Sequence, residues 1–399
     1  MRVLLLSWEY PPVLVGGLGR HVHALSRALA RAGDDVTVVT QHCADAPAEH
    51  TVDGVRIVRA AKSPMPVTTG SASLVSALAL NHCLTRTALK SAPAGGYDVI
   101  HAHDWLVAHT AVTLKEHLDL PLVTTVHATE TGRHQGWLPD EASRSIHAAE
   151  RWLTAESARV VACSHYMRWE LATHLGVPTS RIDVIANGVD PTEWRPCPSE
   201  VHTARQRYAG SGPLLGFAGR LVYEKGVQDL LAAVPQLRAR HRGLRLVVAG
   251  SGPFRGELQQ KTERMGLRDA VSFTGFLGRA LPAVMAATDV MVVPSIYEPF
   301  GMIALEAAAV GVPVAASSTG GLKEIVEPGR TGARFTPADP PALARAVSRL
   351  LDDARSAEQT ARRARHMVCD RYSWTDIAER TRRVYRSAGA AGPASPCPE

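Results

Sequence analysis

The sequence has few of the features that mark specialised classes of protein. Its six cysteines are scattered and form no Cys-x-x-Cys pair, which excludes the usual spacing of a zinc finger and gives no disulfide framework. Thiols used in this way fit a reducing, cytoplasmic environment best. No stretch approaches the ~18 uninterrupted apolar residues of a membrane-spanning helix. The apolar residues 1–7 are too few for the core of a signal peptide and are predicted to form a buried strand.

Strong charge of one sign is also absent. The formal net charge is +6, and no block of Lys and Arg carries interleaved aromatic residues, which argues against a nucleic-acid partner. This mild charge permits anionic substrates and leaves a peripheral contact with an acidic membrane surface open. With 45% hydrophobic and 21% charged residues, the chain has the composition of an ordinary globular protein. Because 399 residues exceed what one core usually serves, two domains of roughly 150 to 200 residues are expected.

The first half begins with a strand, a glycine-rich loop and a helix. Gly16 and Gly17 open the helix, whose apolar residues recur at helical spacing at Leu18, Val22, Leu25 and Leu29. A further strand at residues 35–40 completes a strand, helix, strand unit, which predicts a parallel sheet. The glycine pair allows a ligand to approach the backbone closely. The loop is not a Gly-x-Gly-x-x-Gly fingerprint, and this discounts a nicotinamide cofactor.

Histidines stand at the ends of two further predicted strands, residues 98–102 and 122–126. One segment reads His101-Ala102-His103-Asp104-Trp105, and the other continues into His127. A single histidine at a strand end is more often a hydrogen-bonded structural residue, but two such segments leaving parallel strands on the same side favour a site. The first segment has no further ligand at a regular spacing, so no metal site is predicted. Additional strands are expected at residues 55–58, 159–163 and 183–186.

The second half repeats the alternation of strands and helices. Residues 190–212 contain several prolines and glycines and are predicted to link two domains, with one short helix at residues 201–208. A second doubly wound sheet follows, with strands expected at residues 214–220, 244–249, 271–274, 289–294, 313–316 and 332–335.

Basic residues follow the first strand of this second sheet. Arg220 and Lys225 are suited to neutralise a diphosphate, Arg through its planar fork and Lys as a point charge. The alternative is a solvated loop pair that is bonded to Glu224. Another glycine-rich turn between a strand and a helix lies at residues 318–322.

Two carboxylates flank the turn that follows the strand at residues 289–294. Glu298 precedes this turn, Gly301 lies in it, and Glu306 lies in the helix that follows. The unpaired N–H groups at the start of such a helix suit a phosphate. The alternative is that both acids are ordinary charges at a helix end. Two sheets that place loops and charge at their carboxyl ends predict a cleft between two domains.

These segments together resemble the retaining glycosyltransferases of the GT-B fold, in family four, and most of all the glycogen synthase-like α-glucosyltransferases. The resemblance covers Met1 to about Ala388. It implies an α/β fold of two Rossmann-like, doubly wound parallel-sheet domains that face a central cleft. The expected domains are residues 1–195 with a returning helix at 374–388, then residues 205–372, with a disordered tail at 389–399. The segments that carry the resemblance are Gly16-Gly17-Leu18-Gly19, His101 to Trp105, Val126-His127-Ala128, Asn187-Gly188-Val189-Asp190, Gly219-Arg220, Glu224-Lys225-Gly226, Glu298 to Glu306 and Thr319-Gly320-Gly321.

The resemblance also implies roles for individual residues. Arg220 and Lys225 would bind the donor diphosphate, and Glu306 would bind the ribose hydroxyls. Glu298 would face the transferred sugar, with His103 and His127 near that sugar and Asp104 on the acceptor side. The other residues expected to bind the donor are Gly16, Gly17, Gly301, Met302, Ile303, Thr319 and Gly320.

The expected reaction is transfer of glucose from UDP- or ADP-glucose to an α-1,4-glucan or a related glucose polysaccharide, with retained configuration. Starch-type enzymes carry a lysine before the glycine pair, whereas this chain has Leu14, so the donor base stays open. No Asp-x-Asp is present. The two basic residues would replace a divalent metal, and no cofactor is expected.

Two alternatives remain open. The first is a mannosyltransferase or another sugar transferase that acts on a lipid-linked acceptor. The second is a nucleotide-sugar epimerase, or a silent binding protein, on the same fold.

Overall fold

The computed structural model describes residues 1–62 and 73–390, and the chain divides into two compact units. Unit 1 comprises Met1–Gly188 together with the segment that begins at Trp374, and unit 2 comprises Val189–Ser373. The expected linker begins inside unit 2, where residues 198–208 form a helix. Most of the expected tail lies outside the described residues, and its first two residues, Gly389 and Ala390, belong to the final helix.

Unit 1 is built on an eight-stranded sheet of order β3-β4-β2-β1-β5-β6-β7-β8. All neighbouring strands are parallel except β3, which pairs antiparallel with β4 at the edge. The strands are β1 (Arg2–Leu6), β2 (Asp35–Thr40), β3 (Glu49–Val52), β4 (Val55–Arg59), β5 (Val99–His103), β6 (Leu122–Val126), β7 (Arg159–Ala162) and β8 (Ile182–Val184). The helices are α1 (Gly17–Arg31), α2 (Ser73–Lys90), α3 (Ala108–Leu118), α4 (Glu130–Arg133), α5 (Glu141–Glu156), α6 (His165–His174), α15 (Trp374–Ala390) and the 3₁₀ turns η1 (Trp105–Val107) and η2 (Thr179–Arg181).

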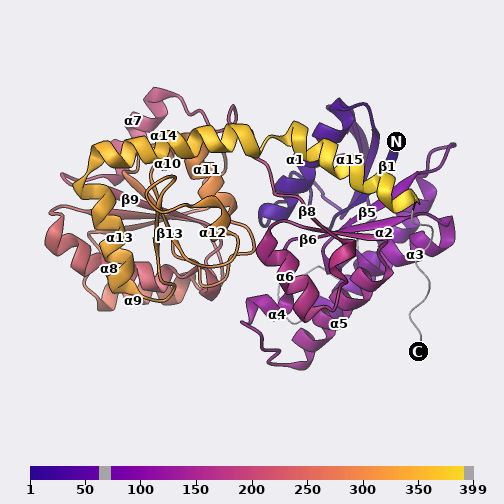
Figure 1. The fold of residues 1–399 in the computed structure, drawn as a ribbon, viewed down its shortest axis with the longest axis horizontal. Helices are drawn as coiled ribbons and strands as arrows, with labels where there is room; N and C mark the ends of the chain where they lie inside the picture. Colours follow the sequence, from indigo (N-terminus) through magenta and orange to yellow (C-terminus); the bar gives the residue numbers. More distant parts are fainter. Residues whose placement is uncertain (63–72, 391–399) are drawn as a thin grey trace. The chain divides into compact units, whose positions relative to one another are not determined.

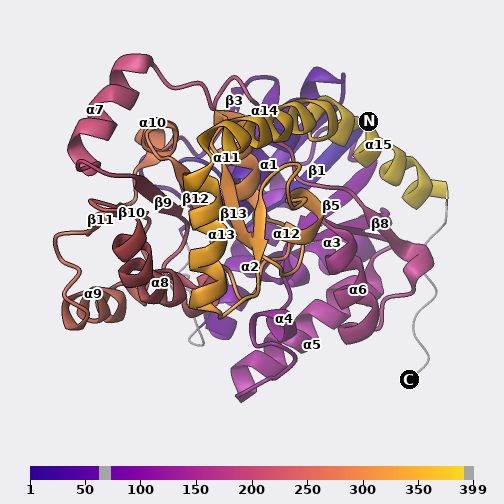
Figure 2. The same ribbon diagram turned by 60° about the vertical axis from the view of Figure 1, so that its left-hand side comes forward.

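Strand β1 shows why this sheet is covered on both faces. Its side chains alternate between the faces, so Val3 and Leu5 enter one core with α1 and α15, while Leu4 and Leu6 enter another with α2 and α3. Figures 1 and 2 show these helices on opposite sides of the sheet. The continuous apolar run predicts such a strand, and the doubly wound parallel sheet is confirmed.

Unit 2 repeats the design with a six-stranded parallel sheet of order β11-β10-β9-β12-β13-β14. Helices α8 and α13 cover one face, and α10, α11 and α14 lie on the other (Figure 1). The strands are β9 (Leu214–Ala218), β10 (Arg245–Ala249), β11 (Val271–Gly275), β12 (Val290–Val293), β13 (Val314–Ser317) and β14 (Ala333–Phe335). The helices are α7 (Pro198–Tyr208), α8 (Val227–Arg240), α9 (Arg255–Arg264), α10 (Leu281–Ala286), α11 (Met302–Val310), α12 (Leu322–Ile325), α13 (Pro340–Asp352), α14 (Ala354–Arg371) and the 3₁₀ turns η3 (Tyr223–Lys225) and η4 (Gly278–Ala280).

Within the described residues, one strand differs from the sequence predictions. The edge strand β3 was not predicted, because its residues are mostly polar and exposed and carry no apolar alternation. Among the helices of the described ranges, none combines the length and the apolar character that crossing a bilayer requires.

Candidate active site

Each sheet changes its direction of winding where the predicted site residues emerge. In unit 1, β1 and β5 are neighbours, and the chain proceeds outward from them in opposite directions. In unit 2, β9 and β12 have the same relation. Open α/β sheets bind ligands at the carboxyl ends of strands at such switch points. The segments after β1 and β5 therefore form the candidate site of unit 1, and those after β9 and β12 form the candidate site of unit 2.

The glycine-rich loop after β1 is held by Glu9, a buried residue that sequence reasoning missed. The Glu9 carboxylate accepts N–H bonds from Val15 at 2.5 Å and Gly16 at 3.1 Å. Burial raises the pKa of Glu9, and these N–H bonds oppose the shift. The Gly16 N–H group is thus already engaged inside the protein, whereas Gly17 begins α1. A signal was present in the sequence, since a charged residue stands three positions after the end of an apolar strand.

The two histidines of β5 have different environments although their side chains share one face of the strand. His101 uses both ring nitrogens, one with the hydroxyl of Tyr385 at 2.7 Å and one with the hydroxyl of Thr125 at 2.7 Å. His103 bonds through Nδ1 to Nε2 of His127 at 3.2 Å, and its Nε2 has no partner among the described residues. His101 is therefore a structural residue, and His103 keeps a nitrogen for a ligand.

A third histidine, His21 on α1, completes this cluster. Its ring lies 4.8 Å from the ring of His127 and 5.6 Å from that of His103, measured between centroids. Nitrogens of His21, His103 and His127 all lie within 4.8 Å of one another, so these residues are the group that could hold a metal ion in the described part of the chain. Sequence reasoning missed His21, although it stands three residues after Leu18 and four before Leu25 in the buried stripe.

Burial keeps these imidazoles neutral. It lowers the pKa of His127 to about 4 and the pKa values of His21, His101 and His103 well below their usual value. The neighbouring imidazoles lower the last three further. Near pH 7 the cluster thus offers neutral donors and acceptors, which suit hydroxyl groups better than phosphate.

Asp104 turns the chain at the end of β5 and connects it to β6. Its φ of 62° lies in a region that residues other than glycine rarely adopt. The Asp104 carboxylate accepts the N–H of His127 at 2.7 Å, which fixes the segment that carries this histidine. Burial raises the pKa of Asp104 to about 6, against the effects of that N–H bond and of Arg133. The structure therefore brings Asp104, His103 and His127 into one connected group.

In unit 2, the loop after β9 carries Arg220 and Lys225. The Arg220 side chain is 41% exposed and lies 3.8 Å from the Glu224 carboxylate. This contact is the one expected from the alternative interpretation, in which the basic residues belong to a solvated loop and bond to Glu224. Gly226 ends the loop at a φ of 69°, and a Cβ there would lie 1.9 Å from the carbonyl oxygen of Pro294. Only glycine fits this position, which packs the loop directly against the segment after β12.

The structure pairs two residues to which the sequence analysis gave separate roles. Lys225 Nζ donates to Glu298 Oε2 at 2.7 Å, and both side chains are largely buried. The Ser295 hydroxyl donates to the same oxygen at 3.1 Å. Backbone N–H groups of Ile296 and Tyr297 bond to the Glu224 carbonyl. A basic loop and an acidic loop thus form one charged unit at the ends of β9 and β12.

The turn before α11 joins β12 to the start of this helix through Gly301. Gly301 has a φ of 115°, and a Cβ there would lie 2.6 Å from Leu322 Cδ2. Met302 and Ile303 form the first turn of α11 with partly exposed side chains, while Glu306 is buried on the same helix at 1% exposure. The N-terminal N–H groups of this nine-residue helix are the feature suited to an anion.

The glycine-rich turn after β13 packs on the same segment. The Thr319 hydroxyl donates to the Ile296 carbonyl at 3.0 Å, and the Gly321 N–H donates to the Glu298 carbonyl at 3.0 Å. Gly320 adopts a φ of 46°. The turns after β9, β12 and β13 therefore converge in unit 2.

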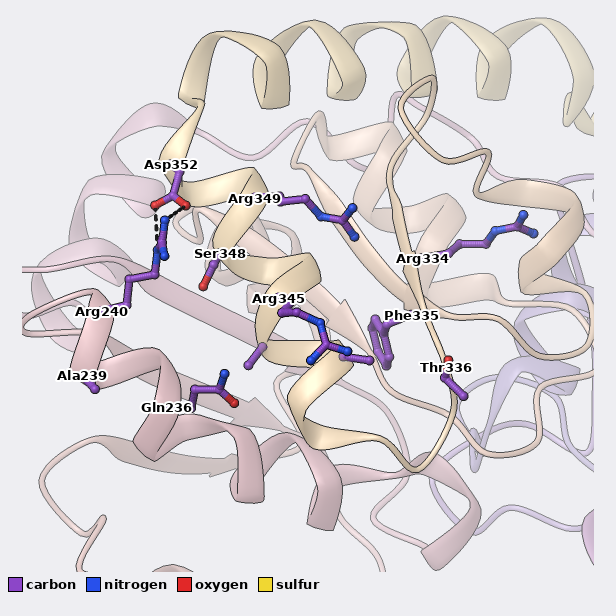
Figure 3. Close-up of a pocket in the computed structure, with 12 residues that line it drawn as sticks. Gln236, Ala239, Arg240, Arg334, Phe335, Thr336, Arg345, Ser348, Arg349 and Asp352 are labelled. Atoms are coloured by element: carbon purple, nitrogen blue, oxygen red, sulfur yellow. Dashed lines mark hydrogen bonds and ion pairs between the residues drawn. The ribbon is translucent and has the colours of Figure 1, made fainter.

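The pocket drawn in Figure 3 is a separate feature of unit 2. It has a volume of about 720 Å³ and contains Arg240, which binds Asp352 through two hydrogen bonds of 3.3 and 2.7 Å. Figure 3 shows Arg345 and Arg349 reaching out from α13 toward β14. None of the predicted site residues lines this pocket.

Comparison with known proteins gives consistent matches along the chain. Residues 15–193 match the family described as Glycosyltransferase Family 4, and residues 200–367 match Glycosyl transferases group 1. The sequence is 42% identical to a glycogen synthase of Mycobacterium tuberculosis, covering 97% of this chain and 95% of that protein. It is 30% identical to an alpha-maltose-1-phosphate synthase of Mycolicibacterium smegmatis, covering 98% and 100%. The fold is similar to that of a sucrose-phosphate synthase from Thermosynechococcus elongatus, with a TM-score of 0.85 and 26% identity over 98% of this chain and 99% of that one.

Proposed function

The chain belongs to the family 4 glycosyltransferases of the GT-B fold and is a glycogen synthase-like glucosyltransferase, and on this premise we propose its full reaction. It transfers glucose from UDP- or ADP-glucose to an α-1,4-glucan or a related glucose polysaccharide, and it retains the anomeric configuration. The observation that carries the proposal is the 42% identity to a glycogen synthase over 97% of the chain.

Unit 2 binds the nucleoside diphosphate in this proposal. Arg220 and Lys225 neutralise the diphosphate, and the N–H groups of Gly301, Met302 and Ile303 bond its oxygens. Glu306 accepts hydrogen bonds from the ribose, with Thr319 and Gly320 beside the donor. Lys225 shares its ammonium between phosphate and Glu298, to which it lies at 2.7 Å. Glu298 thereby faces the transferred glucose.

Unit 1 provides neutral polar groups in this proposal. His127 and His103 hydrogen-bond hydroxyls of the glucose, since their imidazoles are uncharged near pH 7. Asp104, with a pKa of about 6, is ionised at neutral pH and orients the acceptor hydroxyl. Gly16 and Gly17 allow the donor to approach the start of α1.

The chemistry follows from these charges. The bond between glucose C1 and the diphosphate oxygen breaks, and the leaving phosphate accumulates negative charge that Arg220 and Lys225 stabilise. The acceptor oxygen bonds to C1 from the same face, and the departing phosphate takes its proton. The cations Arg220 and Lys225 take the place of a metal, so we expect the activity to persist in EDTA.

Leu14 bears on the choice of donor. Its side chain lies against Gly19, where a Cβ would be 2.7 Å from Leu14 Cδ2. An apolar contact thus stands where starch-type enzymes carry a lysine, and the diphosphate depends on unit 2 for its cations. Both UDP-glucose and ADP-glucose therefore need to be offered.

The experiment is a matrix of donors and acceptors. UDP-glucose, ADP-glucose and GDP-mannose are each offered with maltooligosaccharides, with glucose 1-phosphate and with a lipid extract, with and without EDTA. Elongated maltooligosaccharides from a glucose donor, with an α-linkage by NMR, are the expected result. Glucose 1-phosphate is included because one relative is an alpha-maltose-1-phosphate synthase. Transfer only from GDP-mannose, or only to a lipid acceptor, would contradict the proposal. Epimerisation of the donor sugar without any transfer would contradict it as well.

A further inference from the structure

Helix α6 carries a pair of aromatic rings at the surface of unit 1. Trp169 is 53% exposed, and Tyr166 stands one turn earlier and is partly buried. Their ring centroids are 5.7 Å apart with the planes tilted by 35°, and His174 packs edge-on against Trp169 at 5.4 Å. Aromatic residues make up only 5% of this chain. Exposing this apolar area to water is unfavourable unless something covers it.

Buried polar contacts hold Tyr166, one ring of the pair, in place. The Tyr166 hydroxyl bonds to Glu170, and burial together with this carboxylate raises the pKa of Tyr166. Glu170, only 1% exposed, also accepts from the Thr129 hydroxyl at 3.0 Å. The helix start is capped by Ser164, which accepts the Met167 N–H at 3.0 Å. A ring fixed in this way loses little conformational entropy when a ligand binds, and Trp169 packs between it and His174.

The same contacts connect the ring pair to the candidate site. Thr129 caps α4 through the Gly132 N–H at 2.9 Å and stands two residues after His127. A chain of hydrogen bonds thus runs from Tyr166 through Glu170 to Thr129, in the segment after β6. The strand that precedes α6, β7, is the direct neighbour of β6 in the sheet.

We propose that Tyr166 and Trp169 form an acceptor platform, on which a neutral α-glucan chain docks beside the site of unit 1. This inference rests on the proposed function, because it names where the polymeric acceptor is held. The C–H groups on the face of a glucose ring are apolar and weakly positive, and they match the negative face of an aromatic ring. Docking several glucose units there raises the effective concentration of the chain end at the site.

The charges of α6 favour a sugar over a membrane. A helix that lies in a membrane surface carries a broad basic face opposite its apolar face. Among its ten residues, α6 carries Arg168 and Glu170 as its ordinarily charged groups, and Glu170 is buried. One basic side chain does not make a broad basic face, and this helix surface therefore suits an uncharged polysaccharide better.

The test is affinity electrophoresis of the intact protein through gels with and without glycogen. Trp169→Ala is the test variant and Trp169→Tyr the conservative variant that keeps a ring. Trp137→Ala is the matched control, since Trp137 is 68% exposed in the same unit and makes no ring contact within the described residues. We expect the glycogen-dependent retardation to weaken about tenfold in Trp169→Ala and to persist in the other two. The KM for glycogen should rise to a similar extent, with kcat on a short maltooligosaccharide unchanged.

Three outcomes would overturn the platform. They are undiminished retardation of Trp169→Ala, equal weakening in Trp137→Ala, and Trp169-dependent binding to anionic phosphatidylglycerol vesicles without retardation by glycogen. The proposed reaction fails separately. Retardation that depends on Trp169, in a protein that transfers no glucose to any glucan, would reject the reaction and leave a glucan-binding surface.

Discussion

The candidate sites of the two units solve the problem of burying polar groups in opposite ways. Unit 1 gathers imidazoles inside the protein and keeps them neutral, with the pKa of His127 lowered to about 4. Unit 2 gathers full charges on the turns after β9 and β12 and pairs them, as in the 2.7 Å contact between Lys225 and Glu298. The sheets and their switch points are alike, so the fold alone does not determine the electrostatics.

This difference indicates a division of labour between the units. A diphosphate needs cations and N–H groups that remain charged or polarised at every working pH, which Lys, Arg and a helix start provide. A sugar needs many hydrogen bonds of modest strength, which neutral imidazoles provide without a competing ion. Conditions or substitutions that alter one kind of site should therefore leave the other intact.

The largest expected difference between the two units is the loss of stability of unit 1 at acidic pH. The folded pKa values of His21, His101, His103 and His127 lie below the unfolded value, so their contribution to stability is present above about pH 6.5 and lost as the pH falls toward 4. At pH 5 the lowered pKa of His127 alone reduces the free energy of unfolding by about 2 kcal/mol. The other three histidines reduce it further. Asp104 has a raised folded pKa of about 6, so its protonation increases the free energy of unfolding by about 1 kcal/mol at pH 5 and offsets part of this loss.

Tryptophan fluorescence can follow this loss of stability. Every tryptophan except Trp194 lies in unit 1, so urea unfolding monitored by emission at pH 7.5 and pH 5 reports mainly that unit. We expect a large shift of the midpoint to lower urea at pH 5. A midpoint independent of pH would show that the imidazoles do not stay neutral in the folded protein.

The next largest effect should come from breaking the charged pair of unit 2. Lys225→Ala removes the ammonium from Glu298 and from the proposed diphosphate site, and the transferase rate should fall about 10³-fold. Glu298→Gln keeps the shape but not the charge and should also lower the rate strongly. Arg240→Ala is the matched control, because it breaks an exposed pair with Asp352 in the same unit. Initial rates at saturating donor decide the matter, and a loss below tenfold in Lys225→Ala would reject its role.

A smaller loss is expected when the neutral site loses one imidazole. His127→Phe keeps a ring of similar shape and removes the nitrogen that bonds His103, and we expect kcat to fall about 10²-fold. His109→Phe in the same unit, where His109 packs on Trp152, should leave kcat unchanged. Equal rates for the two variants would show that His127 serves packing and not the substrate.

Much of this architecture can be predicted from the sequence because strand ends and their neighbours follow simple rules. Apolar runs such as 122–126 and 289–294 predict buried parallel strands, and the carboxyl ends of such strands share one edge of the sheet. Glycines at tight turns predict where backbone segments approach closely, as Gly226 and Gly301 do.

Pairings between distant residues escape the same reasoning. The contact between Lys225 and Glu298 joins residues 73 positions apart, and spacing along the chain does not encode it. Likewise, the side chains of His101 and His103 lie on the same face of β5. Only the structure shows that the Tyr385 hydroxyl is hydrogen-bonded to His101. Periodicity predicts which face a side chain takes, whereas the partner on that face depends on tertiary packing.

The smallest expected effect concerns the final helix, which holds the structural histidine of unit 1. Tyr385→Phe removes the hydroxyl that bonds His101 at 2.7 Å and leaves the ring in the core, so it should cost about 1 to 2 kcal/mol of unfolding free energy. Transferase activity should stay unchanged, because His101 points no free nitrogen at the substrate. Urea unfolding followed by tryptophan emission, which reports mainly unit 1, measures this loss. A loss of activity in Tyr385→Phe at unchanged stability would mean that the hydroxyl acts through His101 on the neutral site, and that α15 takes part in its chemistry.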